Sequence, residues 1–304
     1  MTMKKKYRGV IVPMVTPLTE TFALDKAGVE KIMANLYRHG AMPFILGTTG
    51  EAASLPNELK REFIRTAARV KPAGTVLYAG ISSNCLEESV AAAHESFDAG
   101  VDVVAATLPS YYALSESQMQ RYFEQLADKV KGPMIIYNIT ATTHMSIPLE
   151  VLDELSYHPN IVGTKDSERS TERLDRSLKL WANRPDFSHF LGWAAKSAYA
   201  LINGSDGLVP STGNLFPSIY QEMQKAIALG DHERAYSCQH QSDIFGSLYQ
   251  SGRTLGESLW ALKILMQETN LCQSHVMPPL QPMSVKEAAA LIAGLEELLV
   301  KENV

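Results

Sequence analysis

The sequence is poor in cysteine, and its cysteines show no spacing typical of a disulfide framework or a metal site. Cys85, Cys238 and Cys272 lie far apart and form no CxxC pair. An odd number of widely separated cysteines favours a reducing compartment. The histidines show no HxH or HxxxH spacing, so the sequence predicts no metal site.

Long hydrophobic runs and basic clusters are also scarce. No apolar run approaches the roughly 18 residues of a membrane-spanning helix, and no apolar signal segment follows Met1. The net charge is −5, and basic residues gather only in Lys4-Lys5-Lys6, which argues against a nucleic-acid-binding surface. No GxGxxG motif follows the first apolar run, so a dinucleotide cofactor is not expected. We expect a cytoplasmic protein that binds neither nucleic acid nor membrane.

Short apolar runs alternate with amphipathic segments along most of the chain. Near-continuous apolar runs are typical of parallel strands that are covered on both faces. The eight predicted strands are 9–15, 43–46, 76–80, 101–107, 133–137, 161–165, 187–191 and 207–210. Eight strands, each followed by a helix, within about 230 residues favour a (β/α)8 TIM barrel over an open doubly wound sheet. We predict this barrel for residues 1–230.

The alternation stops after Gly230. Segments 231–247, 254–268 and 284–300 have the pattern of three helices, and no linker rich in glycine or serine separates them from the preceding chain. We therefore predict that residues 231–304 form a C-terminal three-helix extension packed on the barrel.

Lys165 ends the sixth predicted strand, where α/β barrels place their chemistry. The run before it contains Ile161 and Val162, and the following Asp166 and Ser167 are good residues to begin a helix. Apolar surroundings lower the pKa of a lysine and favour the neutral amine, which is the nucleophile. From this segment alone, a lysine that extends to the surface or pairs with Asp166 is the more ordinary interpretation.

Two further features are expected at the same end of the barrel. Tyr137 ends the fifth strand, beside the strand of Lys165, and a phenol there can transfer the protons that imine chemistry requires. The turn Gly47-Thr48-Thr49-Gly50 has hydroxyls and open N–H groups that can hold a carboxylate. Singly, a core tyrosine and an ordinary turn explain them, but their agreement with Lys165 favours a catalytic site. The other candidates at strand ends are Thr16, Glu51, Tyr111, Asn138, Asp166, Gly192, Val209 and Ser211.

Four motifs together carry a family resemblance. Gly47-Thr48-Thr49-Gly50-Glu51, the segment from Pro109 to Tyr111, Tyr137-Asn138 and Gly163-Thr164-Lys165-Asp166 resemble the N-acetylneuraminate lyase/dihydrodipicolinate synthase family of pyruvate-dependent class I aldolases. The resemblance covers essentially the whole chain.

This resemblance implies a role for each matched residue. Lys165 would form a Schiff base with pyruvate or another 2-oxo acid, and Tyr137 would be the acid/base beside it. Thr48 and Thr49, next to Gly47, would hold the carboxylate and join a proton relay that Tyr111 completes from a neighbouring subunit. The resemblance also implies a homotetramer built as a dimer of dimers, which needs neither a metal nor an organic cofactor.

Departures from the family pattern concern the second substrate. Thr142 stands where dihydrodipicolinate synthases carry an arginine that clamps a carboxylate, and a threonine cannot supply that bidentate grip. Trp193, after Gly192, stands where sugar-acid members carry an acidic residue. The segments 211–214 and 276–279 look most like 2-keto-3-deoxygluconate aldolase-type members. The substrate-binding candidates in this part of the site are Thr142, Gly192, Trp193 and Val209.

The leading hypothesis is a lyase that cleaves or forms a carbon–carbon bond between a 2-oxo acid and an aldehyde. Within the family, 4-hydroxy-tetrahydrodipicolinate synthase activity is the alternative. Outside it, the alternatives are a metal-dependent barrel aldolase, a phosphate-site isomerase, or a non-catalytic barrel that binds 2-oxo acids. The sequence identifies neither the aldehyde nor the direction of the reaction.

Overall fold

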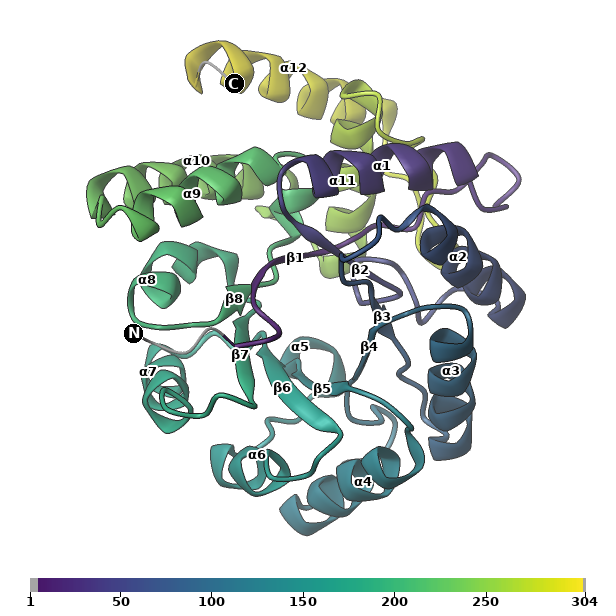
Figure 1. Ribbon diagram of the computed structural model, residues 1–304. Helices are drawn as coiled ribbons and strands as arrows, with labels where there is room; N and C mark the ends of the chain where they lie inside the picture. The colour runs from purple at the N-terminus through teal and green to yellow at the C-terminus, as the bar shows by residue number, and fades with distance from the viewer. Residues whose placement is uncertain (1–4, 303–304) are drawn as a thin grey trace. The chain divides into compact units, whose positions relative to one another are not determined.

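Figure 1 shows a computed structural model of the chain, which describes residues 5–302. The strands follow one another from β1 to β8 and the sheet closes. The pair β1–β8 and the successive pairs from β3 to β8 are parallel. The predicted (β/α)8 barrel fold is therefore confirmed.

The chain divides into two compact units. One joins the segment up to Ile11 with residues 76–210, and the other joins residues 12–75 with the chain from Ser211 onward. The predicted boundary at residue 230, between a barrel and an extension packed on it, stays a prediction.

The first unit contains most of the strands, and Figure 1 shows its helices on the outer side of them. Its strands are the start of β1 (Gly9–Pro13), β3 (Tyr78–Gly80), β4 (Val103–Ala106), β5 (Met134–Asn138), β6 (Ile161–Asp166), β7 (Ser188–Leu191) and β8 (Gly207–Leu208). Its helices are α3 (Leu86–Asp98), α4 (Glu116–Lys129), α5 (Thr140–Thr143), α6 (Leu149–Leu155), α7 (Thr171–Leu180), η1 (Ala194–Lys196) and α8 (Ser197–Ile202).

Helix α4 illustrates how these sequences specify their elements. Ser115 and Gln118 form a capping box at its start, which satisfies backbone N–H groups that the helix leaves free. Met119, Phe123 and Leu126 lie on one buried face at helical spacing. Burying each such side chain contributes roughly 1.5–3 kcal/mol, so the amphipathic pattern fixes which face meets the strands.

The register of β5, β6 and β7 places the candidate catalytic residues. Tyr137 is opposite Lys165, and Lys165 is opposite Phe190. A register shift follows Met134 in β5. At Gly163 a Cβ would lie only 2.5 Å from the Ser188 carbonyl oxygen, so this position admits only glycine.

The second unit is mainly helical. It contains the end of β1, α1 (Lys26–Arg38), β2 (Met42–Ile45), α2 (Asn57–Val70), η2 (Ser211–Asn214), α9 (Pro217–Ala228), α10 (His232–Gln250), α11 (Leu255–Glu268) and α12 (Val285–Glu302). Helix α10 packs against α9, α11 and α12. The last three helices match the predicted ones to within three residues at each end. Helix α11 is unusual because every residue from Ser258 to Met266 is buried.

Two short elements, α5 and η2, were not predicted. The segment around Thr142 forms the four-residue helix α5. The Thr143 hydroxyl donates 2.9 Å to the Ile139 carbonyl, and His144 ends the turn in the left-handed region at φ 57°. A single turn closed by one side chain leaves no periodic pattern in the sequence.

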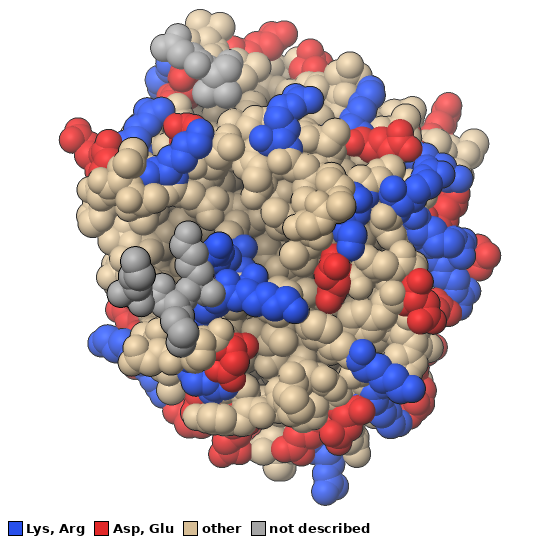
Figure 2. Space-filling view, in the orientation of Figure 1, with Lys and Arg blue, Asp and Glu red and all other residues tan. Residues whose placement is uncertain are grey.

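The charged surface agrees with the scattered pattern in the sequence. On the face shown in Figure 2, acidic and basic side chains of the described residues are interspersed. No helix within residues 5–302 has the length and apolar character needed to cross a membrane.

Candidate active site

Lys165 is a buried lysine at the carboxyl end of β6. Its exposed fraction is 5%, and its Nζ lies 3.7 Å from the centroid of the Tyr137 ring. The two residues are partners across the parallel pair β5–β6, so both side chains leave the same face of the sheet. The structure therefore brings together the two residues that the sequence proposes as nucleophile and acid/base.

Burial changes the chemistry of this amine. Desolvation lowers the pKa of Lys165 below its ordinary value, while the charge interaction and hydrogen bonding with Tyr137 partly oppose this shift. A lowered pKa raises the fraction of neutral amine near neutral pH, and the neutral amine is the nucleophile.

Asp166 does not balance this lysine, although a Lys165–Asp166 pair was the ordinary interpretation of the sequence. Asp166 follows Lys165 in the strand, and its carboxylate accepts from Arg173 Nε at 2.6 Å. It also accepts from Asn138 Nδ2 at 3.1 Å and from the Glu168 backbone N–H at 2.9 Å. Successive strand residues point to opposite faces, so the Asp166 side chain lies on the face of the sheet opposite that of Lys165.

Asn138 links the ends of the two strands to the loops beyond them. Its Nδ2 also donates to Glu168 Oε2 at 3.1 Å, and its Oδ1 accepts from the Ile147 N–H at 3.1 Å. Ser146 Oγ donates to the same Glu168 oxygen at 2.6 Å. The roles of Glu168 and Arg173 were not predicted from the sequence. A buried carboxylate such as that of Asp166 needs a charged or hydrogen-bonding partner, and Arg173, seven residues later in the chain, was the available signal.

Gly192 and Trp193 follow β7 beside these residues. The Gly192 N–H donates to the Asp166 carbonyl at 2.6 Å, and a Cβ on Gly192 would collide with Ser167 Oγ. Trp193 is half-buried, and Lys196 Nζ lies 5.8 Å from its ring centroid. Val209 is buried, and its N–H donates to the Leu191 carbonyl at 2.7 Å.

Thr142 and Tyr111 lie on loops of the same unit. Thr142 is half-buried within α5. Tyr111 is 78% exposed and packs edge-on against Tyr112 at 4.9 Å. Asn84 Oδ1 holds this loop by accepting from the Tyr111 N–H at 3.2 Å. No contact between Tyr111 and Lys165 is observed within the described chain.

The Gly-Thr-Thr-Gly-Glu turn belongs to the second unit and follows β2. The Gly50 N–H donates to the Gly47 carbonyl and the Glu51 N–H to the Thr48 carbonyl, both at 3.1 Å. Thr16 Oγ1 donates to the Gly50 carbonyl at 2.6 Å. Thr49 is buried. The turn is therefore closely fixed by its own backbone and by Thr16.

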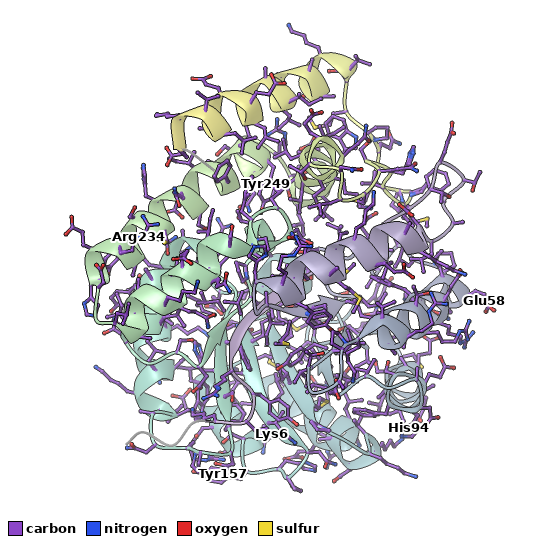
Figure 3. The ribbon with its side chains drawn as sticks, turned by 45° about the horizontal axis from the view of Figure 1, so that its top comes forward. Lys6, Glu58, His94, Tyr157, Arg234 and Tyr249 are labelled. Atoms are coloured by element: carbon purple, nitrogen blue, oxygen red, sulfur yellow. The ribbon has the colours of Figure 1, made fainter. Side chains whose placement is uncertain are left out.

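Ser211, another predicted strand-end residue, lies in the second unit under α10. Its Oγ is 2.6 Å from the hydroxyl of Tyr249, which Figure 3 labels near the end of that helix. Gln250 Nε2 donates to the same hydroxyl at 2.8 Å. Burial raises the pKa of Tyr249, so this phenol stays protonated and serves as a structural donor or acceptor.

Within residues 5–302 no group of three or more histidine, cysteine, aspartate or glutamate side chains is placed to hold a metal ion. The Lys165 amine, with the Tyr137 phenol beside it, is suited to covalent chemistry at the amine.

Comparison with known proteins decides the family. The sequence matches the Dihydrodipicolinate synthetase family over residues 6–298. The chain belongs to this family. A relative from Thermofilum pendens named as an uncharacterized DapA-like lyase is 32% identical over 298 residues, covering 96% of this chain and 98% of the relative.

Two solved structures of the family are closely similar. Dihydrodipicolinate synthase from Bacteroides thetaiotaomicron has a TM-score of 0.91 at 26% identity, covering 97% of this chain and 100% of that one. YagE from Escherichia coli, solved in complex with pyruvate, has a TM-score of 0.90 at 26% identity, covering 96% and 99%. YagE is named as a putative 2-dehydro-3-deoxy-D-gluconate aldolase. The predictions of this family, of an enzyme and of an aldolase or lyase are confirmed.

Proposed function

We propose that this family member is a class I aldolase in which Lys165 forms a Schiff base with pyruvate or another 2-oxo acid. The observation that carries the proposal is the buried Lys165 amine, 3.7 Å from the Tyr137 ring centroid and with a lowered pKa. The pyruvate complex of YagE supports a 2-oxo acid as the first substrate.

The chemistry follows from these two side chains. The neutral Lys165 amine attacks the ketone carbon, the new C–N bond forms, and the ketone oxygen leaves as water after it has been protonated. The resulting iminium withdraws electrons from the next carbon, which loses a proton and attacks the aldehyde carbon, or in reverse releases an aldehyde. The Tyr137 phenol carries protons to and from the substrate oxygens in these steps.

Thr48 and Thr49, with the backbone at Gly47, are proposed to hold the substrate carboxylate. Hydroxyls and turn N–H groups provide donors without a charge, and such turns bind anions. The closely fixed turn supports this role, because donors that are already oriented need little reorganisation on binding.

The second substrate is proposed to be an aldehyde without a carboxylate next to Thr142. A threonine gives no charged bidentate grip, and Gly192, Trp193 and Val209 add no acidic side chain. The name of YagE supports an uncharged sugar aldehyde, because the carboxylate of a 2-dehydro-3-deoxy sugar acid would come from the pyruvate. The named 4-hydroxy-tetrahydrodipicolinate synthases among the relatives, such as that of Kosmotoga olearia at 30% identity, keep that activity as the second candidate.

The experiment that tests the proposal is trapping of the imine. Incubation with pyruvate and borohydride should add one reduced pyruvate to the protein, and peptide mass spectrometry should find it on Lys165. Lys165→Met is the matched control, because it keeps the length of the side chain and removes the amine. No mass increase with pyruvate or with other 2-oxo acids would overturn the proposal.

A screen of aldehydes then separates the remaining candidates. Consumption of pyruvate with an uncharged sugar aldehyde supports the leading function, whereas consumption only with an aldehyde that carries a carboxylate supports the synthase. Loss of activity with EDTA would indicate a metal-dependent aldolase, and labelling without consumption of any aldehyde would indicate a non-catalytic binding protein.

The assembly and location are proposed by resemblance. The exposure of Tyr111 on a loop supports a homotetramer, built as a dimer of dimers, in which this tyrosine reaches a neighbouring subunit. The cysteine content supports a cytoplasmic location.

A further inference from the structure

A fully buried ion pair joins the Gly-Thr-Thr-Gly-Glu turn to the C-terminal part of the chain. Lys263 Nζ on α11 contacts Glu51 Oε1, and both side chains are completely inaccessible to solvent. Glu51 directly follows the segment that contains Thr48 and Thr49. Both partners belong to the second unit.

The remaining polar atoms of the pair are bound to a third segment. Lys263 Nζ donates to the His275 carbonyl at 2.6 Å, and the Met277 N–H donates to Glu51 Oε2 at 2.6 Å. The pair therefore ties together the turn, α11 and the segment that follows α11.

Stability alone is a weak reason to keep such a pair. Removing both charges from water costs several kcal/mol per ion, and well-packed apolar residues in place of a buried pair are often neutral or stabilising. A buried pair is better explained where it fixes a particular conformation.

The turn needs such fixing. Glu51 has φ 57°, a left-handed backbone conformation that a residue with a Cβ keeps only when its surroundings impose it. Next to it, Gly50 has little room, because a Cβ there would lie 3.0 Å from the Met14 carbonyl oxygen. The side chain of Glu51, held at both oxygens, pulls the backbone of the turn into this conformation.

We propose that Lys263 is a positioning residue: it acts through Glu51 to orient the hydroxyls and N–H groups of Thr48 and Thr49 that bind the 2-oxo acid carboxylate. This inference rests on the proposed function of the turn. It assigns a part in substrate binding to the buried helix α11, although Lys263 does not lie at the end of a barrel strand.

The test compares steady-state constants of variants in which the pair has lost its charges. Glu51→Gln/Lys263→Met keeps nearly the same volume, and the glutamine keeps an acceptor for the Met277 N–H. We expect this variant to fold, with a melting temperature near that of the wild type, and to raise KM for pyruvate roughly ten- to hundredfold, as expected when a hydrogen bond to a charged group is lost. The kcat at saturating pyruvate should change less than KM.

Lys5→Met is the matched control. Lys5 forms the other largely buried lysine pair in the described chain, with Asp206 at 2.8 Å, at the amino end of β8 rather than at a carboxyl end. Its loss should lower the melting temperature and leave KM unchanged.

The outcomes separate this inference from the proposed function. If the wild type is labelled by pyruvate and the folded double variant keeps the wild-type KM, Lys263 is only structural and the inference is overturned. If the wild type itself is not labelled, the proposed function fails first. Should the double variant not fold, Glu51→Gln alone, which keeps the size of the side chain and one of its two acceptor oxygens, must show the raised KM for the inference to stand.

Discussion

Lys165 is buried at the end of its strand, and desolvation is the largest influence on its pKa. Asp166, the nearest carboxylate in the sequence, is occupied by Arg173, and the opposite residue in β7 is Phe190. The Tyr137 side chain lies against the amine and partly opposes the shift. The pKa of Lys165 is therefore governed mainly by desolvation.

This gives a pH prediction for the amine. Lysine normally loses its proton near about 10.4, and burial lowers the pKa of Lys165. The neutral amine, and with it the rate of imine formation, should rise with pH and level off below that ordinary value. Exchange of the methyl protons of pyruvate into deuterated water, followed by NMR, measures this rate without an aldehyde.

The same shift has a consequence for stability, with a defined sign. The unfolded chain binds the lysine proton more tightly than the folded chain, so Lys165 makes the free energy of unfolding increase as pH rises from the folded pKa toward the unfolded one. Lys165→Met should remove this part of the pH dependence. A rate of exchange that rises only near the ordinary lysine pKa would contradict both expectations.

Strand pairing and the ion pair between Asp166 and Arg173 together hold the ends of β5 and β6. The inner faces of β5 and β6 carry Tyr137 and Lys165, and the next residue of each strand, Asn138 or Asp166, enters the polar network on the outer face. Arg173, at the start of α7, closes this network. The inner geometry is thus supported from the outside of the sheet.

Breaking this network should destabilise the protein strongly. Arg173→Met leaves the buried Asp166 carboxylate without its cation, and removal of one partner from a buried pair costs roughly 3–5 kcal/mol. Urea unfolding measures the loss. Arg176→Met is the control, because Arg176 is three residues further along α7 and pairs with Glu150 at an exposed site, where ion pairs contribute little. Equal stability of the two variants would contradict the role of Arg173.

The sequence predicted the elements well because each carries a local signal. Apolar runs, caps and helical spacing placed the barrel strands and the last three helices to within a few residues. The proximity of Tyr137 and Lys165 was predicted because the two residues end adjacent strands of a parallel barrel. The ion pairs of Arg173 with Asp166 and of Lys263 with Glu51 were not predicted. A local sequence pattern does not indicate which carboxylate a basic side chain on a helix will contact. The burial of every residue from Ser258 to Met266 in α11 was likewise not predicted.

The exposure of Tyr111 bears on both the proposed proton relay and the proposed assembly. A phenol that is 78% exposed on a loop can serve a proton relay only if another surface brings it to a site. In the proposed homotetramer, a second copy of the chain would supply that surface.

Tyr111→Phe should therefore lower turnover roughly tenfold or more, as loss of a proton-transfer group does, while pyruvate still labels Lys165. Tyr112→Phe is the control, because Tyr112 is equally exposed and packs on Tyr111. Its turnover should be unchanged. Turnover of Tyr111→Phe at the wild-type level would remove the residue from the relay.

Mixing of subunits tests the direction of this contribution. Tyr111→Phe and Lys165→Met chains, unfolded and refolded together, should form mixed oligomers in which one site has both groups. Activity above that of either variant alone is expected if the tyrosine serves a neighbour. If the mixture shows only the average activity of the two variants, the tyrosine serves its own chain.

The pair between Glu51 and Lys263 also sets an order of events during synthesis. Lys263 lies 212 residues beyond Glu51. At about 5–20 residues per second, the ribosome adds this cation on the order of ten seconds or more after the carboxylate. A carboxylate that is buried without a cation is costly, so the final packing of the turn around Glu51 requires a residue that is made after the strands that carry Tyr137 and Lys165.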